Sequence, residues 1–290
     1  MKHFGLSCAL ALPLKEGFEI DYRRLVVHAQ RCLDAGCSSV TVFGTTGEGA
    51  SVSLIEREKV LDALLGVGLN LKHKVIGGIT ATSLGDAVAQ AQMIVDSGCR
   101  GMLVAPPFYF KKVTEEGLYA WFSQFFEKVA LRGCDVILYH IPSVTETPLS
   151  LKLISQLKTA YPDIVKGVKD SGADWSYTEK LLGMDSELLT LIGNERHLAA
   201  GVRLGAQGSI SGLANLCPEI LLELIDSGVD DPRVGELVLE ILKFPVTAAV
   251  KALLAHRDKD PAWSKVRPPL VSLAPSEMAQ LGNCYDRIFS

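Results

Sequence analysis

The chain has 290 residues, of which 48% are hydrophobic and 21% charged, and its formal net charge is −4. That length suits either two ordinary domains or one large α/β barrel. The acidic balance and the lack of a basic tract argue against a nucleic-acid-binding surface. No apolar stretch is long enough to cross a bilayer, so we expect no membrane contact.

The N-terminal sequence MKHFGLSCALALPL superficially resembles an export signal, because a charged start precedes an apolar run and Cys8. The run before Cys8 covers only residues 4–7, whereas an exported segment needs about 7–15 apolar residues. We therefore expect the first core strand here. The seven cysteines are scattered and form no zinc-binding pattern. We expect packed thiols, no metal and a cytoplasmic setting.

Short β-type runs recur along the chain, and each is followed by a helix-type pattern. The predicted strands cover residues 4–12, 38–44, 74–80, 101–107, 135–141, 164–170, 188–194 and 206–212. Between the early strands, the amphipathic segments 22–36 and 84–98 predict helices that end at glycine. Residues 53–56 (SLIE) predict a capping box that opens another helix.

Eight strands alternating with helices predict a parallel sheet that is covered on both faces. Eight such units within about 230 residues favour a closed (β/α)8 TIM barrel over an open doubly wound sheet. The GTTGEG sequence after the second strand lacks the glycine order of a dinucleotide-binding loop. We assign residues 1–215 to the barrel and residues 216–290 to a C-terminal helical extension packed on it.

Barrel enzymes place their catalytic groups at the C-terminal ends of the strands. The polar residues at the predicted ends, in chain order, are Thr45, Thr46, Glu48, Tyr109, Tyr139, Lys169, Asp170, Asn194 and Glu195. The eighth strand carries the glycine-rich sequence GSISG. We expect these groups to surround one site.

Two lysines, Lys166 and Lys169, lie in the sixth predicted strand, where burying an ammonium group is costly. Alternation predicts opposite faces, with Lys169 facing the barrel interior and Lys166 facing the helices. Lys166 is also near the start of the strand, where its head can reach water. Burial disfavours a charged lysine, and a neutral amine attacks ketones to form an iminium that stabilises an adjacent carbanion. The alternative is a buried structural ion pair between Lys169 and Asp170 or a neighbouring acid.

Carbon–carbon bond chemistry beside a keto group also needs a proton shuttle and an anchor for a carboxylate. Tyr139 and Tyr109 can supply the shuttle, with Thr46 as a relay. The hydroxyl and backbone N–H groups of the GTTGEG turn, including Thr45 and Gly47, can hold the carboxylate. The alternatives are ordinary core tyrosines and a plain strand-to-helix turn.

In sequence and order, these motifs resemble the dihydrodipicolinate synthase and N-acetylneuraminate lyase superfamily of class I, pyruvate-type aldolases, over about residues 4–290. The resemblance rests on GTTGEG (44–49), SLIERE (53–58), PPFYFK (107–112), YHIP (139–142), GVKDS (167–171) and GNE (193–195). It implies a (β/α)8 fold, a Schiff base between Lys169 and pyruvate or another 2-oxo acid, and no cofactor, because the imine is itself the electron sink. It also implies a homotetramer built as a dimer of dimers.

The resemblance also implies roles for individual residues. Tyr139 would be the acid/base group, and Thr46 would link it to Tyr109, which such enzymes often contribute across a subunit interface. Thr45 and Thr46 would contact the carboxylate, and Ile210 would line the pocket with its backbone carbonyl. We also expect Gly47 and Asn194 to bind the substrate.

Two departures bear on the substrate. The synthases carry an arginine in the segment after the active-site tyrosine, whereas the sequence YHIPSVT has Val144 at that position. Valine cannot form the two parallel hydrogen bonds that a guanidinium donates to a carboxylate. Leu12 also replaces a threonine typical of the first strand. We therefore favour cleavage of a 2-keto-3-deoxy sugar acid into pyruvate and an aldehyde. The alternatives are the synthase itself, a dehydratase or deaminase of a 2-oxo acid, and a 2-oxo-acid-binding regulatory protein.

Two histidines are expected to be structural. His140 follows the active-site tyrosine directly, so alternation turns it to the other face of the strand. His197 lies on the predicted helix after the seventh strand.

Overall fold

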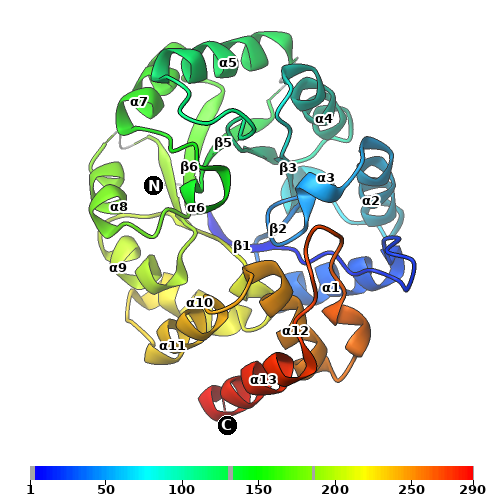
Figure 1. The fold of residues 1–290 in the computed structure, drawn as a ribbon. Helices are drawn as coiled ribbons and strands as arrows, with labels where there is room; N and C mark the ends of the chain where they lie inside the picture. The colour runs from blue at the N-terminus through cyan, green and yellow to red at the C-terminus, as the bar shows by residue number, and fades with distance from the viewer. Residues whose placement is uncertain (1–3, 130–132, 185–186, 290) are drawn as a thin grey trace.

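The structure is a computed structural model that describes residues 4–129, 133–184 and 187–289. In these residues, eight parallel strands close into a barrel in chain order, and the last strand pairs with the first (Figure 1). The strands are β1 (Gly5–Ala9), β2 (Ser39–Val42), β3 (Val75–Ile79), β4 (Gly101–Val104), β5 (Asp135–His140), β6 (Val165–Asp170), β7 (Leu189–Ile192) and β8 (Gly208–Ser211). Each predicted strand is confirmed, and so is the TIM barrel.

Helices surround the barrel; all but the last of those named here lie between successive strands, and the last follows β8 (Figure 1). They are α1 (Tyr22–Asp34), α2 (Leu54–Gly66), α3 (Leu71–Lys74), α4 (Leu84–Asp96), α5 (Glu115–Lys128), α6 (Pro142–Thr145), α7 (Leu151–Ala160), α8 (Trp175–Leu182), α9 (Leu198–Arg203) and α10 (Pro218–Ser227). The predicted capping box opens α2: the Ser53 hydroxyl accepts from the Glu56 N–H, and the Glu56 carboxylate accepts from the Ser53 N–H. None of the helices in the described ranges is long and apolar enough to cross a membrane.

Three further helices follow α10: α11 (Pro232–Ile241), α12 (Val246–Asp258) and α13 (Pro275–Phe289). α11 and α12 are separate because Pro245 lacks the N–H group that a continuing helix needs. α12 is buried along residues 247–255, between the barrel and α13, which lies outermost at the bottom of Figure 1. The extension therefore packs its middle helix directly against the barrel.

Alternate strand residues divide the core into two parts. One face packs against the helices, and the other forms a separate apolar cluster that includes Ile76, Leu103, Ile137, Leu191 and Ile210. This second cluster fills the barrel interior, as layered side chains do in this fold. The seven cysteines are free and buried, as expected for packed thiols.

The prediction that Lys166 faces the helices is wrong. The β5–β6 register shifts between Val136 and Ile137, which leaves Lys166 as an extra residue in β6. This irregularity interrupts the alternation on which the prediction depended. Lys166 instead lines a small cavity at the amino-terminal end of the barrel, beside Phe4 and Leu189, and its Nζ donates to the Pro162 carbonyl at 3.2 Å.

Candidate active site

Lys169 and Tyr139 lie side by side inside the barrel, near the carboxyl ends of β6 and β5. They are register partners in the two adjacent strands. The Lys169 Nζ donates a hydrogen bond to the Tyr139 phenol oxygen at 3.3 Å and lies 4.4 Å from the centre of the ring. Lys169 is 5% exposed and Tyr139 is 4% exposed. The two groups therefore meet in a site that is almost closed to solvent.

Lys169 has no acidic partner in the described part of the chain. The predicted alternative, an ion pair with Asp170, is wrong because the strand turns Asp170 toward the helices. One Asp170 oxygen accepts from the Thr178 hydroxyl at 2.6 Å, and the other accepts from the Gly172 N–H at 2.9 Å. Space beside the amine depends on Gly193, where a Cβ would lie 3.0 Å from the Lys169 Cε.

The GTTGEG turn after β2 brings a hydroxyl to the same tyrosine. The Thr45 Oγ1 lies 3.3 Å from the Tyr139 phenol oxygen. The sequence predicted this relay contact for Thr46, but no hydrogen bond joins Thr46 to either tyrosine among the described residues. Thr46 is 8% exposed and lines the same cavity. In this structure the hydrogen-bonded chain runs from Lys169 through Tyr139 to Thr45.

The turn requires its glycines for steric reasons. A Cβ at Gly49 would lie 1.8 Å from the Phe43 carbonyl oxygen. The Gly49 N–H donates to the Gly44 carbonyl, which closes the turn. Phe43 and Glu48 both adopt left-handed backbone conformations, with φ of 61° and 52°. Such values are uncommon for residues other than glycine and indicate a conformation imposed by the surroundings.

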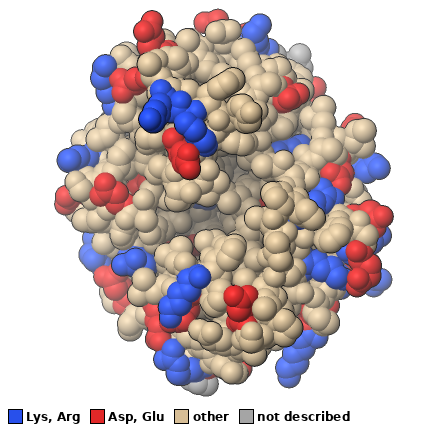
Figure 2. Space-filling model, viewed as in Figure 1, with Lys and Arg blue, Asp and Glu red and all other residues tan. Residues whose placement is uncertain are grey.

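A cavity of about 260 Å³ opens above these groups, at the carboxyl ends of the strands. Its polar lining comes from the barrel, and the described residues are Thr45, Thr46, Tyr139, Ser143, Lys169, Ser171, Asn194 and Glu195. One wall is aliphatic and comes largely from α11, α12 and the residues between them: Val238, Ile241, Leu242, Val246 and Val250. Figure 2 shows a hollow in the centre of this face with largely uncharged surroundings.

The charges at this cavity are few. Of the described lining residues, Lys169 is the one lysine or arginine, and Glu195 is the one acid. The Glu195 carboxylate accepts from the Ser211 hydroxyl at 2.5 Å and from the Leu213 N–H at 3.3 Å. Val144, at the position where the family resemblance implies an arginine in the synthases, lines the mouth and is 56% exposed.

The remaining predicted site residues lie at different distances from this cavity. Asn194 lines it, and its side-chain oxygen caps the next turn by accepting from the Arg196 N–H. Gly47 and Ile210 are buried beside it but are not among its described lining residues. Tyr109 is 74% exposed and stacks edge-on against Phe110, so this chain does not bring it to Tyr139.

Sequence reasoning missed the aliphatic wall and two serines, Ser143 and Ser171. Ser143 immediately follows the motif YHIP and Ser171 ends the motif GVKDS, so their positions after strand ends were an available signal. No signal in the sequence indicated the aliphatic wall, because the sequence shows that α11 and α12 are amphipathic but does not show which surface they cover.

The two histidines are structural, as predicted. His140 faces away from Tyr139, stacks on Tyr177 with ring centres 4.1 Å apart, and accepts at Nδ1 from the Leu149 N–H. Burial lowers the pKa of His140. His197 packs edge-on against Trp175, and burial lowers its pKa as well.

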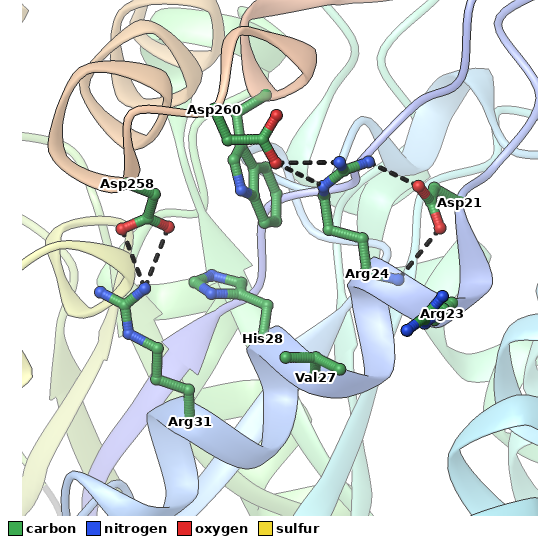
Figure 3. A pocket seen from close by; sticks show the side chains of 9 residues that line it. Asp21, Arg23, Arg24, Val27, His28, Arg31, Asp258 and Asp260 are labelled. Carbon is green, nitrogen blue, oxygen red and sulfur yellow. Dashed lines mark hydrogen bonds and ion pairs between the residues drawn. The ribbon is translucent and has the colours of Figure 1, made fainter.

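A second concave region lies on the outer surface, between α1 and the segment after α12 (Figure 3). This groove measures about 400 Å³ and is lined by several charged residues. Arg24 pairs with Asp21 and Asp260, and Arg31 pairs with Asp258. The pairs with Asp258 and Asp260 join the extension to the barrel.

No cluster of three or more histidine, cysteine or acidic residues in the described ranges is placed to hold a metal ion. The reactive side chains that the cavity does bring together are the lysine, the tyrosine and the hydroxyl groups. A buried lysine against a tyrosine at the strand ends of a barrel is the arrangement that a class I lyase, which acts through a lysine Schiff base, requires.

Comparison with known proteins specifies the family. Residues 2–286 match the model of the Dihydrodipicolinate synthetase family. A DapA-like lyase of Chloroflexus aurantiacus, described as uncharacterized, is 30% identical, and the alignment covers 99% of this chain and 97% of that protein. The chain belongs to the dihydrodipicolinate synthetase family, and it is a class I lyase of that family.

Two further relatives are described as synthases. The crystal structure of dihydrodipicolinate synthase from Agrobacterium tumefaciens has a TM-score of 0.96 and 46% identity, covering 99% of this chain and 100% of that one. A 4-hydroxy-tetrahydrodipicolinate synthase from Methanopyrus kandleri is 29% identical, covering 96% of both chains. These comparisons show the family and do not place the chain in its sugar-acid aldolase branch.

Proposed function

We propose that this lyase reversibly cleaves a 2-oxo acid into pyruvate and an uncharged aldehyde, with Lys169 as the Schiff-base residue. The observation that carries the proposal is the position of the Lys169 nitrogen. It is buried, lies 3.3 Å from the Tyr139 phenol oxygen and has no described acidic partner. A structural lysine at this depth would need a counter-ion, whereas a nucleophile needs an adjacent acid/base group.

The proposed reaction uses each group of the hydrogen-bonded chain. The Lys169 amine adds to the keto carbon and water leaves, which gives an iminium. Cleavage of the carbon–carbon bond then sends its electron pair to the iminium, while Tyr139 takes the hydroxyl proton of the departing aldehyde. Thr45 holds the Tyr139 phenol and passes protons to and from it. Protonation and hydrolysis of the remaining enamine release pyruvate.

The charge of the cavity supports an uncharged second product. Lys169 is consumed by the imine, and the other described lining residues supply no cation for a second carboxylate. An aldehyde carrying a carboxylate, such as aspartate semialdehyde, would meet Val144 where the synthases offer an arginine. Cleavage of a 2-keto-3-deoxy sugar acid yields an uncharged hydroxyaldehyde, and Ser143, Ser171 and Asn194 supply polar groups for its hydroxyls.

The experiment that tests the substrate is a direct comparison of two reactions. Pyruvate release from 2-keto-3-deoxygluconate is measured against condensation of pyruvate with aspartate semialdehyde. We expect the first to proceed with the higher kcat/KM. Condensation with aspartate semialdehyde at a higher kcat/KM would instead identify a synthase, the function in the names of two of the relatives.

The remaining candidates use the same imine. A dehydratase or deaminase would turn over a 2-oxo acid without releasing an aldehyde, which mass spectrometry of the products distinguishes. A regulatory protein would bind 2-oxo acids without turnover. We also propose a cytoplasmic homotetramer, a dimer of dimers, in which Tyr109 reaches a site across an interface. The exposure of the Tyr109–Phe110 pair supports that arrangement.

A further inference from the structure

A fully buried ion pair joins the extension to the GTTGEG turn. The Lys251 Nζ on α12 lies 2.5 Å from the Glu48 Oε1, and both side chains are 0% exposed. Burial lowers the pKa of Lys251, and the attraction of Glu48 opposes that effect. Removing two charges from water costs free energy that can exceed their mutual attraction, so a buried ion pair adds little to the stability of the fold. Its position behind the turn points to another role.

Arg267, in the segment after α12, closes on the same turn. Its backbone N–H donates to the second Glu48 oxygen at 2.7 Å. Its guanidinium donates to the Ser51 carbonyl at 2.7 Å and pairs with Glu56. Both Glu48 oxygens are therefore bound by groups of the extension.

A third contact reaches the turn beside the catalytic chain. The Thr247 hydroxyl donates to the Thr45 carbonyl at 3.2 Å. Thr247 and Lys251 are four residues apart on α12, so they lie on one face of the helix. Next to them on the chain, Val246 and Val250 line the cavity. One helix thus builds the cavity wall and binds the turn that holds the Thr45 hydroxyl.

We propose that α12 positions the Thr45–Thr46 turn for binding the substrate carboxylate, with Thr247 and the Lys251–Glu48 pair as positioning residues. The proposal rests on the proposed function, because it assumes that this turn binds the carboxylate of the 2-oxo acid substrate. The left-handed conformations of Phe43 and Glu48 explain why external contacts are needed, because non-glycine residues keep them only when their surroundings impose them. The C-terminal extension is then part of the active site.

The first test changes only a hydroxyl. Thr247→Val removes the hydrogen bond to Thr45, and Thr247→Ser keeps it. Pyruvate binding is measured as the concentration that gives half-maximal adduct when borohydride traps the imine. We expect Thr247→Val to raise that concentration about threefold to tenfold, the factor that one hydrogen bond supplies. Thr247→Ser is expected to match the wild type.

The second test replaces the ion pair without leaving one charge buried. Glu48→Gln with Lys251→Met retains an acceptor for the Arg267 N–H and is expected to weaken pyruvate binding at least as much as Thr247→Val. The matched control is Arg31→Met, which removes the Arg31–Asp258 pair at 2.9 Å (Figure 3). That pair also joins α12 to the barrel but does not contact the turn. We expect wild-type pyruvate binding in the control.

Hydrogen–deuterium exchange of a peptide covering residues 43–52 gives a readout that needs no ligand. We expect faster exchange in Thr247→Val and in the double variant, but not in Arg31→Met. Wild-type pyruvate binding and wild-type exchange in both altered proteins would overturn the proposal, even if their melting temperatures fall. A wild-type protein that traps no pyruvate would instead overturn the proposed function, and the exchange data would still decide whether α12 holds the turn.

Discussion

The phenol oxygen of Tyr139 lies 3.3 Å from the side-chain nitrogen of Lys169, and the two residues face each other across the β5–β6 ladder. Because the strands fix both side chains, this distance is set by the barrel rather than by a mobile loop. The phenol is also the one tyrosine hydroxyl that this chain brings to the lysine among the described residues. It is therefore the group that we expect to move protons at the imine.

Replacing that phenol tests its role. Tyr139→Phe keeps the ring that packs beside Lys169 and removes the hydroxyl. We expect kcat for aldol cleavage to fall by about two to four orders of magnitude, the usual contribution of a general acid/base group. Borohydride should still trap the imine on Lys169 in this variant when the incubation is longer. A kcat within a factor of about three of the wild type would contradict an acid/base role.

The two threonines of the turn are expected to differ. Thr45 contacts the Tyr139 phenol, whereas Thr46 lines the cavity without a described bond to it. Thr45→Val should therefore lower kcat, and Thr46→Val should mainly raise KM for the 2-oxo acid. Steady-state kinetics separates the two effects. A lower kcat in Thr46→Val and a higher KM in Thr45→Val would instead identify Thr46 as the relay, as the family resemblance implies.

Val144 provides a gain-of-function test of substrate charge. Val144→Arg introduces a guanidinium at the mouth of the cavity, where it can bind a carboxylate with two hydrogen bonds. We expect kcat/KM for aspartate semialdehyde to rise by about tenfold or more, because a charged hydrogen bond supplies about 1.5–3 kcal/mol. Val144→Met is the control for side-chain length. An equal gain in both variants would exclude charge as the cause.

The sequence predicts the barrel and the juxtaposition of Lys169 and Tyr139 well because both follow from local patterns. Each β-run carries its own signal, and strand ends of this fold lie together whatever the intervening helices contain. Lys169 and Tyr139 were accordingly identified from their positions in β6 and β5. Contacts that depend on packing were harder to predict. The β6 irregularity redirects Lys166, and the choice between Thr45 and Thr46 depends on the shape of one turn.

The extension shows the same limit. Its helices were expected, but nothing in their sequence indicates that α12 meets the GTTGEG turn. Lys251 and Glu48 are separated by 203 residues, and either alone has the appearance of an ordinary charged residue. Tyr109 shows the converse: its motif resembles that of the family, yet this chain leaves it 74% exposed and away from Tyr139.

Glu56 gives a prediction for pH dependence. Its hydrogen bond with Arg267 is the main reason that its pKa is lowered to about 2, from an ordinary value near 4.5. A carboxylate whose pKa is lower in the folded state than in the unfolded state stabilises the folded state. This contribution is fully present above pH 4.5, the ordinary pKa, and it is lost as the pH falls from about 4.5 toward 2. The free energy of unfolding of Glu56→Gln should therefore lie below that of the wild type at pH 7, with the gap narrowing below pH 4.5.

Urea unfolding at a series of pH values measures that gap. Glu58→Gln is the control, since Glu58 lies on the same helix, is exposed and forms no described ion pair. It should differ little from the wild type at any pH. A gap for Glu56→Gln that stays constant between pH 7 and pH 3 would rule out the Arg267 contact as its source.

The most direct measurement of the central claim is the mass of the protein after incubation with pyruvate and borohydride. Peptide mapping should find a reduced pyruvate adduct on Lys169 and no adduct in Lys169→Arg, whose guanidinium cannot form the imine. Adduct formation at another lysine, or an unmodified wild-type protein at saturating pyruvate, would contradict the assignment of Lys169 as the Schiff-base residue.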